Sequence, residues 1–265
     1  MAGDIGHPDL CLWGNVRPNF LLGIVLPTGL GRELDVIVGI MQPTYLPWLG
    51  YFDMMSRVDI FVLLDNVQFQ KKSWQQRNRI RSPKGELLLT VPVRTSGRFE
   101  QEIREVEIDP STGFARKHIR SIASNYQRAP YVDETLPQLA ALIEKNSLPL
   151  SGFNEALIRF MAEILQVSTV IINASSLLAS GKRTQLTVNQ CLELGADQFL
   201  AAEGSRPYIS KEKAFDKHGI VVEYHNFVHP NYPQLYGNFI PNLSAIDLIL
   251  NCGRNAVRYA PWIDR

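Results

Sequence analysis

The stretch that decides the fold runs from residue 36 to residue 65, VIVGIMQPTYLPWLGYFDMMSRVDIFVLLD. It begins and ends with short apolar, β-branched runs, VIVGIM at 36–41 and DIFVLLD at 59–65. Such runs are typical of strands that are buried on both faces. Between them, a proline-rich loop leads into WLGYFDMMSRV, which we expect to be a helix. Strand, helix and strand in this order form the unit from which parallel sheets are built.

The next part of the chain predicts a hairpin and three helices. QQRNRIRS and ELLLTVPV are two strand-like runs joined by the turn Pro83-Lys84-Gly85. Asp109 is expected to cap a helix that has Pro110 in its first turn and runs to about Tyr126. Two further helices are expected near 132–145 and 152–166.

The second half of the chain alternates strands and helices again. Short apolar runs predict strands at 168–173, 197–202 and 220–225. Helices are expected between them, one capped by Thr184 and one capped by Ser210 and ended by Gly219, and NLSAIDLILNCG at 242–253 predicts a closing helix. The fold class is therefore α/β: a mostly parallel sheet flanked by helices, with a basic β-hairpin insertion and a helical middle segment.

Residues 1–35 differ from the rest, because they mix glycine, proline and isolated apolar residues without a helical or strand period. We expect them to form a loose arm before a single α/β domain at 36–265. Val36 and Val38 are candidate translation starts, and a start at either would mean that the arm is not native.

Composition narrows the classes of function. The 265 residues are 45% hydrophobic, and 27 basic residues face 26 acidic ones, which excludes general disorder and argues against binding to duplex nucleic acid. Cys11, Cys191 and Cys252 are far apart, as expected for reduced thiols in the cytoplasm. The longest uncharged segment, 18–31, contains two prolines and three glycines and is shorter than the roughly 20 apolar residues of a membrane span.

Polar residues follow each predicted strand of the sheet. Ligands of open parallel sheets bind at the carboxyl ends of the strands, so these residues would share one rim if the strands are adjacent. The alternative is that loops are polar in any protein. The residues are Gln42 and Thr44 after the first strand, Asp65, Asn66 and Gln68 after the second, Ser175 and Ser176 after the third, Glu203, Ser205 and Arg206 after the fourth, and Asn226, His229, Asn231 and Tyr232 after the last.

The segment QPTYLPWLGYF (42–52) predicts a stiff loop with flat surfaces that can stack on a base or a sugar ring. Alternatively, at least two of Trp48, Tyr51 and Phe52 are core residues of the following helix. The order of strand, proline loop, glycine and helix also resembles the ATP-binding turn of HUP-class nucleotidyltransferases. In that pattern a histidine follows the glycine, whereas Tyr51 follows Gly50 here.

A cationic run follows, with no acidic residue between Asp65 and Glu86 and with Phe69 and Trp74 interleaved. Alternation along the predicted strand places Arg77, Arg79 and Arg81 on one face, which favours a stripe that binds phosphates. A site for single-stranded nucleic acid or an RNA acceptor end, or simply a solvated face, are the alternatives. The run consists of Lys71, Lys72, Arg77, Arg79, Arg81 and Lys84.

Candidates for catalysis are His229, which precedes a proline at the mouth of the last strand, and Asp65, which ends the second strand. His229 could act as a general base or bond backbone carbonyls, and Asp65 could hold an amine or form a turn. His225 and His229 are four residues apart, but the strand and Pro230 argue against a helix that holds both on a metal. No metal site is therefore expected, and no cofactor is indicated.

Three long motifs resemble the WbqC-like family: IMQPTYLPWLGYFDMM, DIFVLLDNVQFQKKSWQQRNRI and HPNYPQLYGNFIPNLSAIDLILNCG. The resemblance runs from about Val36 to about Asn255, and AAEGSRPYI at 201–209 departs from the expected Ser-Gly beginning. It implies a bacterial protein of O-antigen or other surface-polysaccharide biosynthesis and a glycine or acyl transfer onto an amino sugar. By position it implies a site made of Gln42, Tyr45, Asp65, Gln68, Trp74, Arg77, Asn78, His229, Tyr232, Gln234, Asn242 and Asn251.

These observations predict a cytoplasmic acyl or aminoacyl transferase that acts on an amino group of a small, nucleotide-linked sugar. Lys72, Arg77 and Arg79 would hold phosphates. Tyr45 and Trp74 would stack on a ring, His229 would deprotonate the amine and Asp65 would position it. A carrier or a tRNA remains open as the acyl donor, and no membrane partner is expected. The alternatives are a HUP-like nucleotidyltransferase or ATP-dependent ligase, and a non-catalytic subunit that binds a sugar or carrier.

Overall fold

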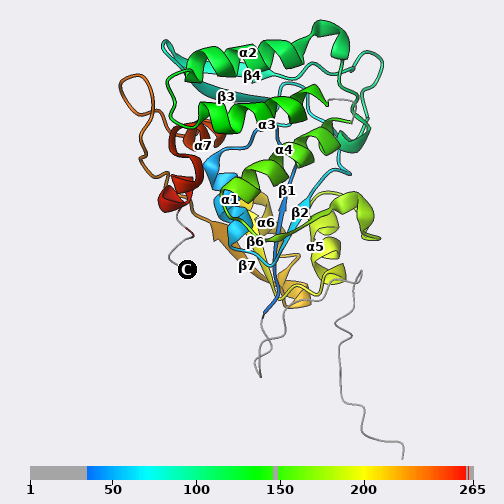
Figure 1. Ribbon diagram of the computed structural model, residues 1–265. Helices are drawn as coiled ribbons and strands as arrows, with labels where there is room; N and C mark the ends of the chain where they lie inside the picture. Colours follow the sequence, from blue (N-terminus) through cyan, green and yellow to red (C-terminus); the bar gives the residue numbers. More distant parts are fainter. Residues whose placement is uncertain (1–34, 146–148, 261, 263–265) are drawn as a thin grey trace, which may run out of the picture. The chain divides into compact units, whose positions relative to one another are not determined.

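The computed structural model describes residues 35–145, 149–260 and 262, so the predicted arm lies outside the described residues except for Asp35. Five parallel strands form the central sheet in the order β5-β2-β1-β6-β7 (Figure 1). The strands are β1 (Ile37–Met41), β2 (Ile60–Leu63), β5 (Val170–Asn173), β6 (Gln198–Ala202) and β7 (Val221–His225). The predicted α/β class and the parallel sheet are confirmed.

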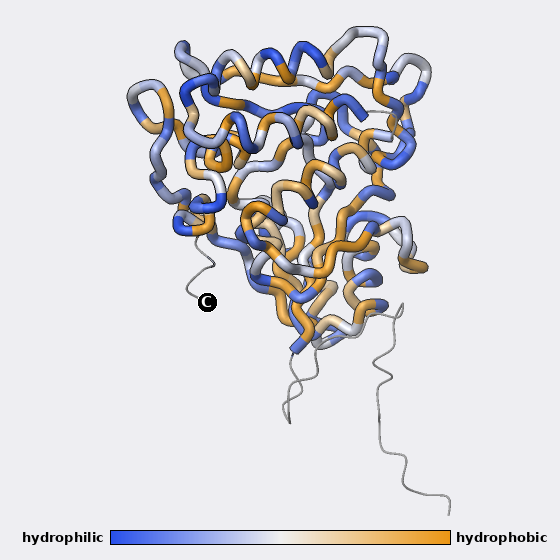
Figure 2. The backbone as a smooth tube through the Cα atoms, in the orientation of Figure 1, coloured by the Kyte–Doolittle hydropathy of each residue, from blue (hydrophilic) through white to orange (hydrophobic). Residues whose placement is uncertain are grey.

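Alternate side chains of each strand point to opposite faces of the sheet. Helices pack against both of these faces, so the strands contribute to two separate core clusters. Val38 and Val62 belong to a core cluster that includes residues of α5 and α6, whereas Phe61 and Leu63 belong to a larger cluster with α1 and α4. Figure 2 accordingly shows the central strands as largely hydrophobic. These helices are α1 (Leu49–Ser56), α4 (Leu150–Ile164), α5 (Thr184–Glu193) and α6 (Arg206–Glu212).

The antiparallel hairpin and the remaining helices lie beyond the carboxyl edge of the sheet (Figure 1). Ile80 and Leu89 on the inner face of the hairpin join the same core cluster as Ile122 and Tyr126 of α2. These elements are β3 (Arg77–Ser82), β4 (Gly85–Thr90), α2 (Phe114–Tyr126), α3 (Val132–Glu144) and α7 (Ile246–Cys252). Short 3₁₀ helices lie at Ile103–Glu105, Pro110–Thr112, Ala174–Ser176, Glu203–Ser205, Asp216–His218 and Gly253–Tyr259.

Helix starts differ from the sequence-based expectation in two places. Asp109 caps a 3₁₀ turn rather than a long helix, because Gly113 adopts a left-handed conformation (φ 61°) and α2 begins only at Phe114. Ser210 lies inside α6, where its hydroxyl donates to the Arg206 carbonyl at 2.6 Å, so it caps nothing. That helix ends at Glu212, and the C-cap residue Lys213 is also left-handed (φ 47°).

Other predicted boundaries shift by a few residues. Thr184 is the first residue of α5, and Arg183 occupies the cap position without a side-chain hydrogen bond. Gly219 (φ 70°) ends the 3₁₀ helix Asp216–His218 as the predicted glycine stop. The closing helix begins at Ile246 rather than near residue 242. Within the described ranges, no helix has the length and apolar character to cross a membrane.

The strand order creates a topological switch in the middle of the sheet. β1 is followed by β2, its neighbour on one side, whereas β6 is followed by β7, on the other side. Ligands of open α/β sheets bind in the crevice outside the carboxyl ends of the strands at such a point. The loops that follow β1 and β6 are therefore expected to border a ligand-binding site.

Candidate functional site

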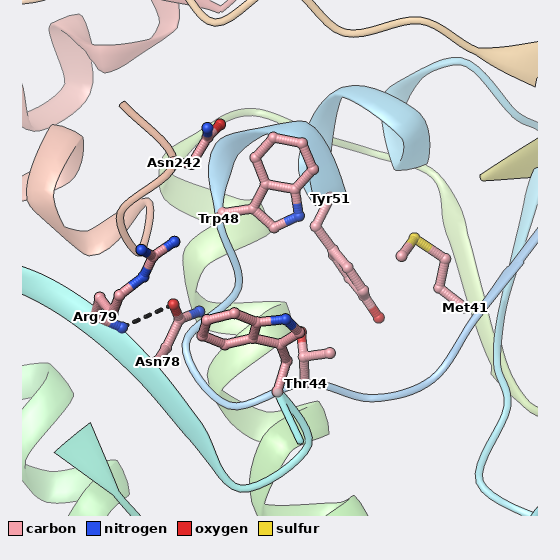
Figure 3. A pocket seen from close by; sticks show the side chains of 8 residues that line it. Met41, Thr44, Trp48, Tyr51, Asn78, Arg79 and Asn242 are labelled. Atoms are coloured by element: carbon pink, nitrogen blue, oxygen red, sulfur yellow. Dashed lines mark hydrogen bonds between the residues drawn. The ribbon is translucent and has the colours of Figure 1, made fainter. Parts of the chain in front are cut away.

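A cavity of about 340 Å³ opens beside the loop that follows β1, next to the switch point (Figure 3). Its walls come from the end of β1, the start of α1, the segment before β3, β3 itself and the segment before α7. The side chains that line it are Met41, Thr44, Trp48, Tyr51, Trp74, Asn78, Arg79 and Asn242. Trp74 and Arg79 were predicted to bind the substrate, and Asn78 and Asn242 were implied by the resemblance. Thr44 was expected only as a rim residue, Trp48 and Tyr51 only as part of the loop 42–52, and Met41 was not singled out.

The loop beside this cavity is held by the side chain of Asn78 and by one backbone–backbone hydrogen bond. The Asn78 amide donates to the carbonyls of Tyr45 (3.1 Å) and Leu46 (2.6 Å), and the Tyr45 N–H donates to the Trp74 carbonyl (3.0 Å). Leu46 is left-handed, with φ 44°. Asn78 is buried, and its side-chain nitrogen holds the loop. Its side-chain oxygen, Oδ1, accepts from the Arg79 backbone N–H.

Trp48 forms one wall because Gly50 leaves room for its indole. A β-carbon built on Gly50 would lie 2.4 Å from the indole ring. The indole also meets the ring of Phe227 edge to face, with centroids 5.1 Å apart. Gly50, the glycine that resembles the one in the ATP-binding turn of nucleotidyltransferases, thus packs against the ring of Trp48.

The opposite wall combines an exposed indole with guanidinium groups. Trp74 is 48% exposed, and the Arg79 and Arg77 guanidinium carbons lie 5.3 Å and 5.9 Å from its ring centroid. Arg79 also pairs with Glu86 at 2.8 Å, whereas Arg77 has no ion pair within the described part of the chain. The Nε atoms of both arginines are buried and lack a partner among the described atoms.

Arg81 lies on the same face of the hairpin, as predicted, but it has a different role. Its guanidinium donates to the carbonyls of Leu235, Tyr236 and Asn238, and the side chain is buried. Arg81 therefore holds the long segment before α7. Of the three arginines, Arg79 lines the cavity, and Arg77 lies over the ring of Trp74 without lining it.

Three other predicted binding residues lie outside the lining. Lys72 is exposed, and its backbone N–H donates to the Gln76 side chain. Gln68 is exposed and donates to the Phe99 carbonyl at 3.0 Å. The Gln42 side-chain oxygen accepts from Gln75 at 2.8 Å.

The role predicted for Tyr45 is wrong, because a fully buried ring cannot stack on a ligand. Its hydroxyl hydrogen-bonds His118 at 2.8 Å, and its ring stacks on Phe153 with centroids 5.9 Å apart. Burial raises the pKa of the Tyr45 hydroxyl far above its usual value. The phenol is therefore a neutral part of the core.

The two predicted catalytic residues have different partners. Asp65 is buried, and its carboxylate accepts from the Ser175 N–H at 2.8 Å and the Ser175 hydroxyl at 2.7 Å. It ties the loop after β2 to the loop after β5, while His229 follows β7 at the other end of the sheet. No hydrogen bond joins the two residues in the described structure, and neither lines the cavity.

His229 lies one aromatic ring away from the cavity wall. Its ring is 5.6 Å from those of Phe227 and Phe239, and Phe227 in turn contacts Trp48. Nδ1 donates to the Pro230 carbonyl at 2.9 Å, and Nε2 is buried without a partner in the described structure. Burial lowers the pKa of His229, so the ring is neutral and Nε2 carries a lone pair.

Three more predicted residues converge on an aspartate that the sequence did not single out. Tyr232 and Gln234 each donate to the Asp247 carboxylate at 2.8 Å, and the Asn251 side chain donates to the Asp247 carbonyl at 2.7 Å. Tyr126 donates to the other carboxylate oxygen at 2.6 Å. Burial raises the pKa of Asp247 despite these hydrogen bonds, and the cluster anchors the segment before α7.

A second buried carboxylate was also missed. Asp53 of α1, which is fully buried, bonds His225 Nε2 at 2.6 Å and Arg57 at 2.7 Å. His225 is the last residue of β7, so the pair joins α1 to that strand. Asp53 and His225 are 172 positions apart, and no local pattern links them.

The rim residues that follow β6 form hydrogen bonds within their own turn. Glu203 and Arg206 form a two-point ion pair at 2.6 Å and 2.7 Å, and the Ser205 hydroxyl donates to the Ala202 carbonyl.

Residues 35–145, 149–260 and 262 contain no cluster of three or more His, Cys, Asp or Glu side chains arranged to hold a metal.

Sequence comparison places the chain in a family of proteins. The model of the WbqC-like protein family matches residues 42–259, which include every lining residue except Met41. An uncharacterized protein of Mycobacterium tuberculosis, Rv1507c, is 35% identical over 224 residues, covering 84% of this chain and 96% of the relative. No solved structure matches the chain. On the extent of the family match, this chain belongs to the WbqC-like protein family.

Proposed function

We propose that this protein is a transferase that places an acyl or aminoacyl group on the amino group of a nucleotide-linked sugar. The observation that carries the proposal is the cavity at the switch point, which is lined by Trp48, Trp74 and Arg79, with the guanidinium groups of Arg79 and Arg77 over the exposed Trp74 ring. Flat aromatic faces suit sugar rings or bases, and guanidinium groups suit phosphates.

The size of the cavity supports a ligand that is only partly enclosed. A volume of about 340 Å³ is at the small end of ligand pockets, which span roughly 300–1,000 Å³. It accommodates one ring with its phosphate. The rest of a nucleotide-linked sugar would extend along the segment before β3, where Lys71 and Lys72 are exposed cations.

Transfer to an amine requires loss of a proton, because an amine attacks only in its neutral form. His229 is the base that we propose for this step, because its neutral ring has an unpartnered Nε2 lone pair. Phe227 separates the His229 ring from Trp48, so the step requires Phe227 to move aside when the ligand binds. Asp65 is bonded to Ser175, so its proposed part becomes shaping of the rim rather than holding the amine. The acyl donor would enter from the open side of the cavity.

The cellular setting belongs to the same proposal. Buried, free Cys191 and Cys252 fit the cytoplasm, where thiols stay reduced. The resemblance in the sequence motifs supports a place in surface-polysaccharide or O-antigen biosynthesis. The resulting product would be an N-acylated sugar nucleotide.

Calorimetric titration with UDP-glucosamine tests the proposal, with ATP and Mg²⁺ as the competing ligand. We expect binding of the sugar nucleotide, and a loss of about tenfold for Trp74→Ala or Arg77→Ala. Stacking on an aromatic side chain contributes roughly 1–3 kcal/mol, and a hydrogen bond to a charged group about 1.5–3 kcal/mol. Lys84→Ala is the matched control, because it removes one cation of the same hairpin outside the cavity lining. Binding of ATP alone, with pyrophosphate release, would instead favour nucleotidyl transfer.

The use of Gly50 favours the sugar transferase over that alternative. In a nucleotide-binding turn the glycine lets the backbone approach a phosphate, but here the space beside Gly50 is filled by Trp48. A non-catalytic sugar-binding subunit differs in one measurable way. It would bind UDP-glucosamine without consuming any acyl or aminoacyl donor, and His229→Gln would change nothing.

A further inference from the structure

Two buried carboxylates hold the ends of a short stretch in the long loop that joins β7 to α7 (Figure 1). At one end, Asp53 of α1 bonds His225 Nε2 at 2.6 Å. At the other end, Asp247 of α7 accepts from the Tyr232 hydroxyl at 2.8 Å. Both carboxylates are fully buried. Residues 226–231, which we call the strap, therefore lie between two anchors on different helices.

The strap itself is held weakly. Within the described chain, no hydrogen bond connects residues 226–231 to another part of the protein, and the bond from His229 Nδ1 to the Pro230 carbonyl is internal to the strap. Val228 in its middle is 79% exposed. Ring contacts of Phe227 and His229 are thus what fastens the strap. Segments with few buried contacts and no backbone hydrogen bonds are the ones that open locally in folded proteins.

Phe227 stands between the cavity and His229. Its ring meets the rings of Trp48 and His229 edge to face, with centroids 5.1 Å and 5.6 Å apart. It also lies nearly parallel to the His225 ring at 6.1 Å. Phe227 does not line the cavity itself. Moving its ring away would therefore join the cavity to the His229 imidazole without removing any lining residue.

His229 is occluded in this conformation but is held independently of Phe227. Nε2 is buried and has no partner among the described residues, so neither solvent nor a ligand reaches it. Nδ1 donates to the Pro230 carbonyl at 2.9 Å. On the side away from Phe227, the ring contacts Tyr232 at 6.0 Å and Phe239 at 5.6 Å. Phe227 can thus swing out while these contacts keep the imidazole in place.

We propose that Phe227 is a gate, which swings outward with its part of the strap and opens the path from the cavity to His229. The inference rests on the proposed function, which makes His229 the base, and deepens it by naming the positioning residue that controls access to this base. A ligand whose amine meets Nε2 binds only the open conformation, so it shifts the strap toward that conformation.

Carbethoxylation by diethyl pyrocarbonate, followed residue by residue by mass spectrometry, tests the gate in the full chain without any ligand. The reagent needs an imidazole lone pair, and in His229 only the occluded Nε2 has one. We expect Phe227→Ala to speed labelling of His229 by about tenfold or more relative to the exposed His218, because local opening limits the reaction. The buried His118 should stay protected. Val228→Ala, which trims an exposed neighbour of Phe227, is the matched control and should change nothing.

A second measurement links the gate to the ligand. The apparent affinity of a ligand that binds one conformation is its intrinsic affinity multiplied by the fraction of the protein in that conformation. Calorimetric titration of UDP-glucosamine into Phe227→Ala should therefore show tighter binding, by a factor that approaches the gain in His229 labelling. Phe227→Leu, which still offers an apolar side chain to Trp48, should show smaller gains in both measurements.

The outcomes separate the gate from the proposed function. Unchanged labelling of His229 in both Phe227 variants would overturn the gate, and the proposed function would stand if UDP-glucosamine binding still depends on Trp74. An equal rise in labelling at His118 would show general unfolding and would also overturn the gate. Faster labelling of His229 without tighter binding in either variant would overturn the coupling to the ligand. Failure of the unmodified chain to bind UDP-glucosamine would overturn the proposed function and the inference with it.

Discussion

The indole of Trp48 occupies the space that a side chain at Gly50 would need, with a built β-carbon only 2.4 Å from the ring. This close approach places the indole at the cavity wall and in contact with Phe227. The β1 loop, the start of α1 and the segment before α7 are thus joined at one aromatic contact. The geometry of the cavity depends on it.

Gly50→Ala should displace the indole and open the cavity. We expect a loss of about 1–3 kcal/mol in the free energy of unfolding from overpacking, and at least a tenfold loss in affinity for UDP-glucosamine. Urea denaturation and calorimetry would measure the two effects. Gly204→Ala is the control, because a β-carbon there meets nothing within 4 Å. An unchanged affinity in Gly50→Ala would contradict the role given to Trp48.

Glu86→Gln should strengthen phosphate binding, because it releases Arg79 from its ion pair at 2.8 Å. The pair is partly exposed, so its contribution is small, about 0.2–1 kcal/mol, which corresponds to a gain of up to about fivefold in affinity. The gain should shrink at high salt. A weaker affinity in Glu86→Gln would mean that Glu86 contacts the ligand itself.

Stability should fall in acid because of His118. Burial lowers its pKa to about 4, against an ordinary value of 6.5, while the hydrogen bond to the Thr90 backbone partly opposes the shift. The neutral ring is thus favoured in the fold, so its contribution is fully present above pH 6.5 and is lost as the pH falls toward about 4. The loss amounts to about 3 kcal/mol.

His118→Asn isolates this effect, since its amide can still accept from the Tyr45 hydroxyl. Urea denaturation of both proteins between pH 7 and pH 4 should show a steeper decline for the unmodified protein. Parallel curves would exclude His118 as the source of the pH dependence.

Asp247→Asn should destabilise the protein by about 1–3 kcal/mol, because one amide oxygen replaces two carboxylate oxygens that serve three donors. Tyr232→Phe removes one of those hydrogen bonds and should cost less. The exposed Asp216→Asn is the control for loss of a charge. Equal unfolding free energies for Asp247→Asn and Asp216→Asn would refute the anchoring role.

Much of the fold could be predicted because buried parallel strands carry their signal locally. The runs at 36–41 and 59–65 are apolar on both faces, and they contain β1 and β2. Helix caps were less predictable. Ser210 has the right chemistry for a cap, but its hydroxyl bonds the carbonyl four residues earlier inside a helix.

The site was predicted in part, since its position after β1 follows from the sheet but its partners do not. Tyr45 and Trp48 are in the same loop, but the ring of Tyr45 is fully buried whereas the ring of Trp48 lines the cavity. Leu46, which lies between them in the sequence, has a left-handed backbone conformation. Arg81 shares a face with Arg79 but bonds carbonyls more than 150 positions away. Nothing near Arg81 in the sequence indicates that pairing.

The measurement that tests the central claim most directly is titration of UDP-glucosamine into the full chain and into Trp74→Ala, with Lys84→Ala as control. The account predicts saturable binding that Lys84→Ala retains and that Trp74→Ala weakens at least tenfold. Equal binding by Trp74→Ala, or binding of ATP with Mg²⁺ in place of the sugar nucleotide, would contradict it.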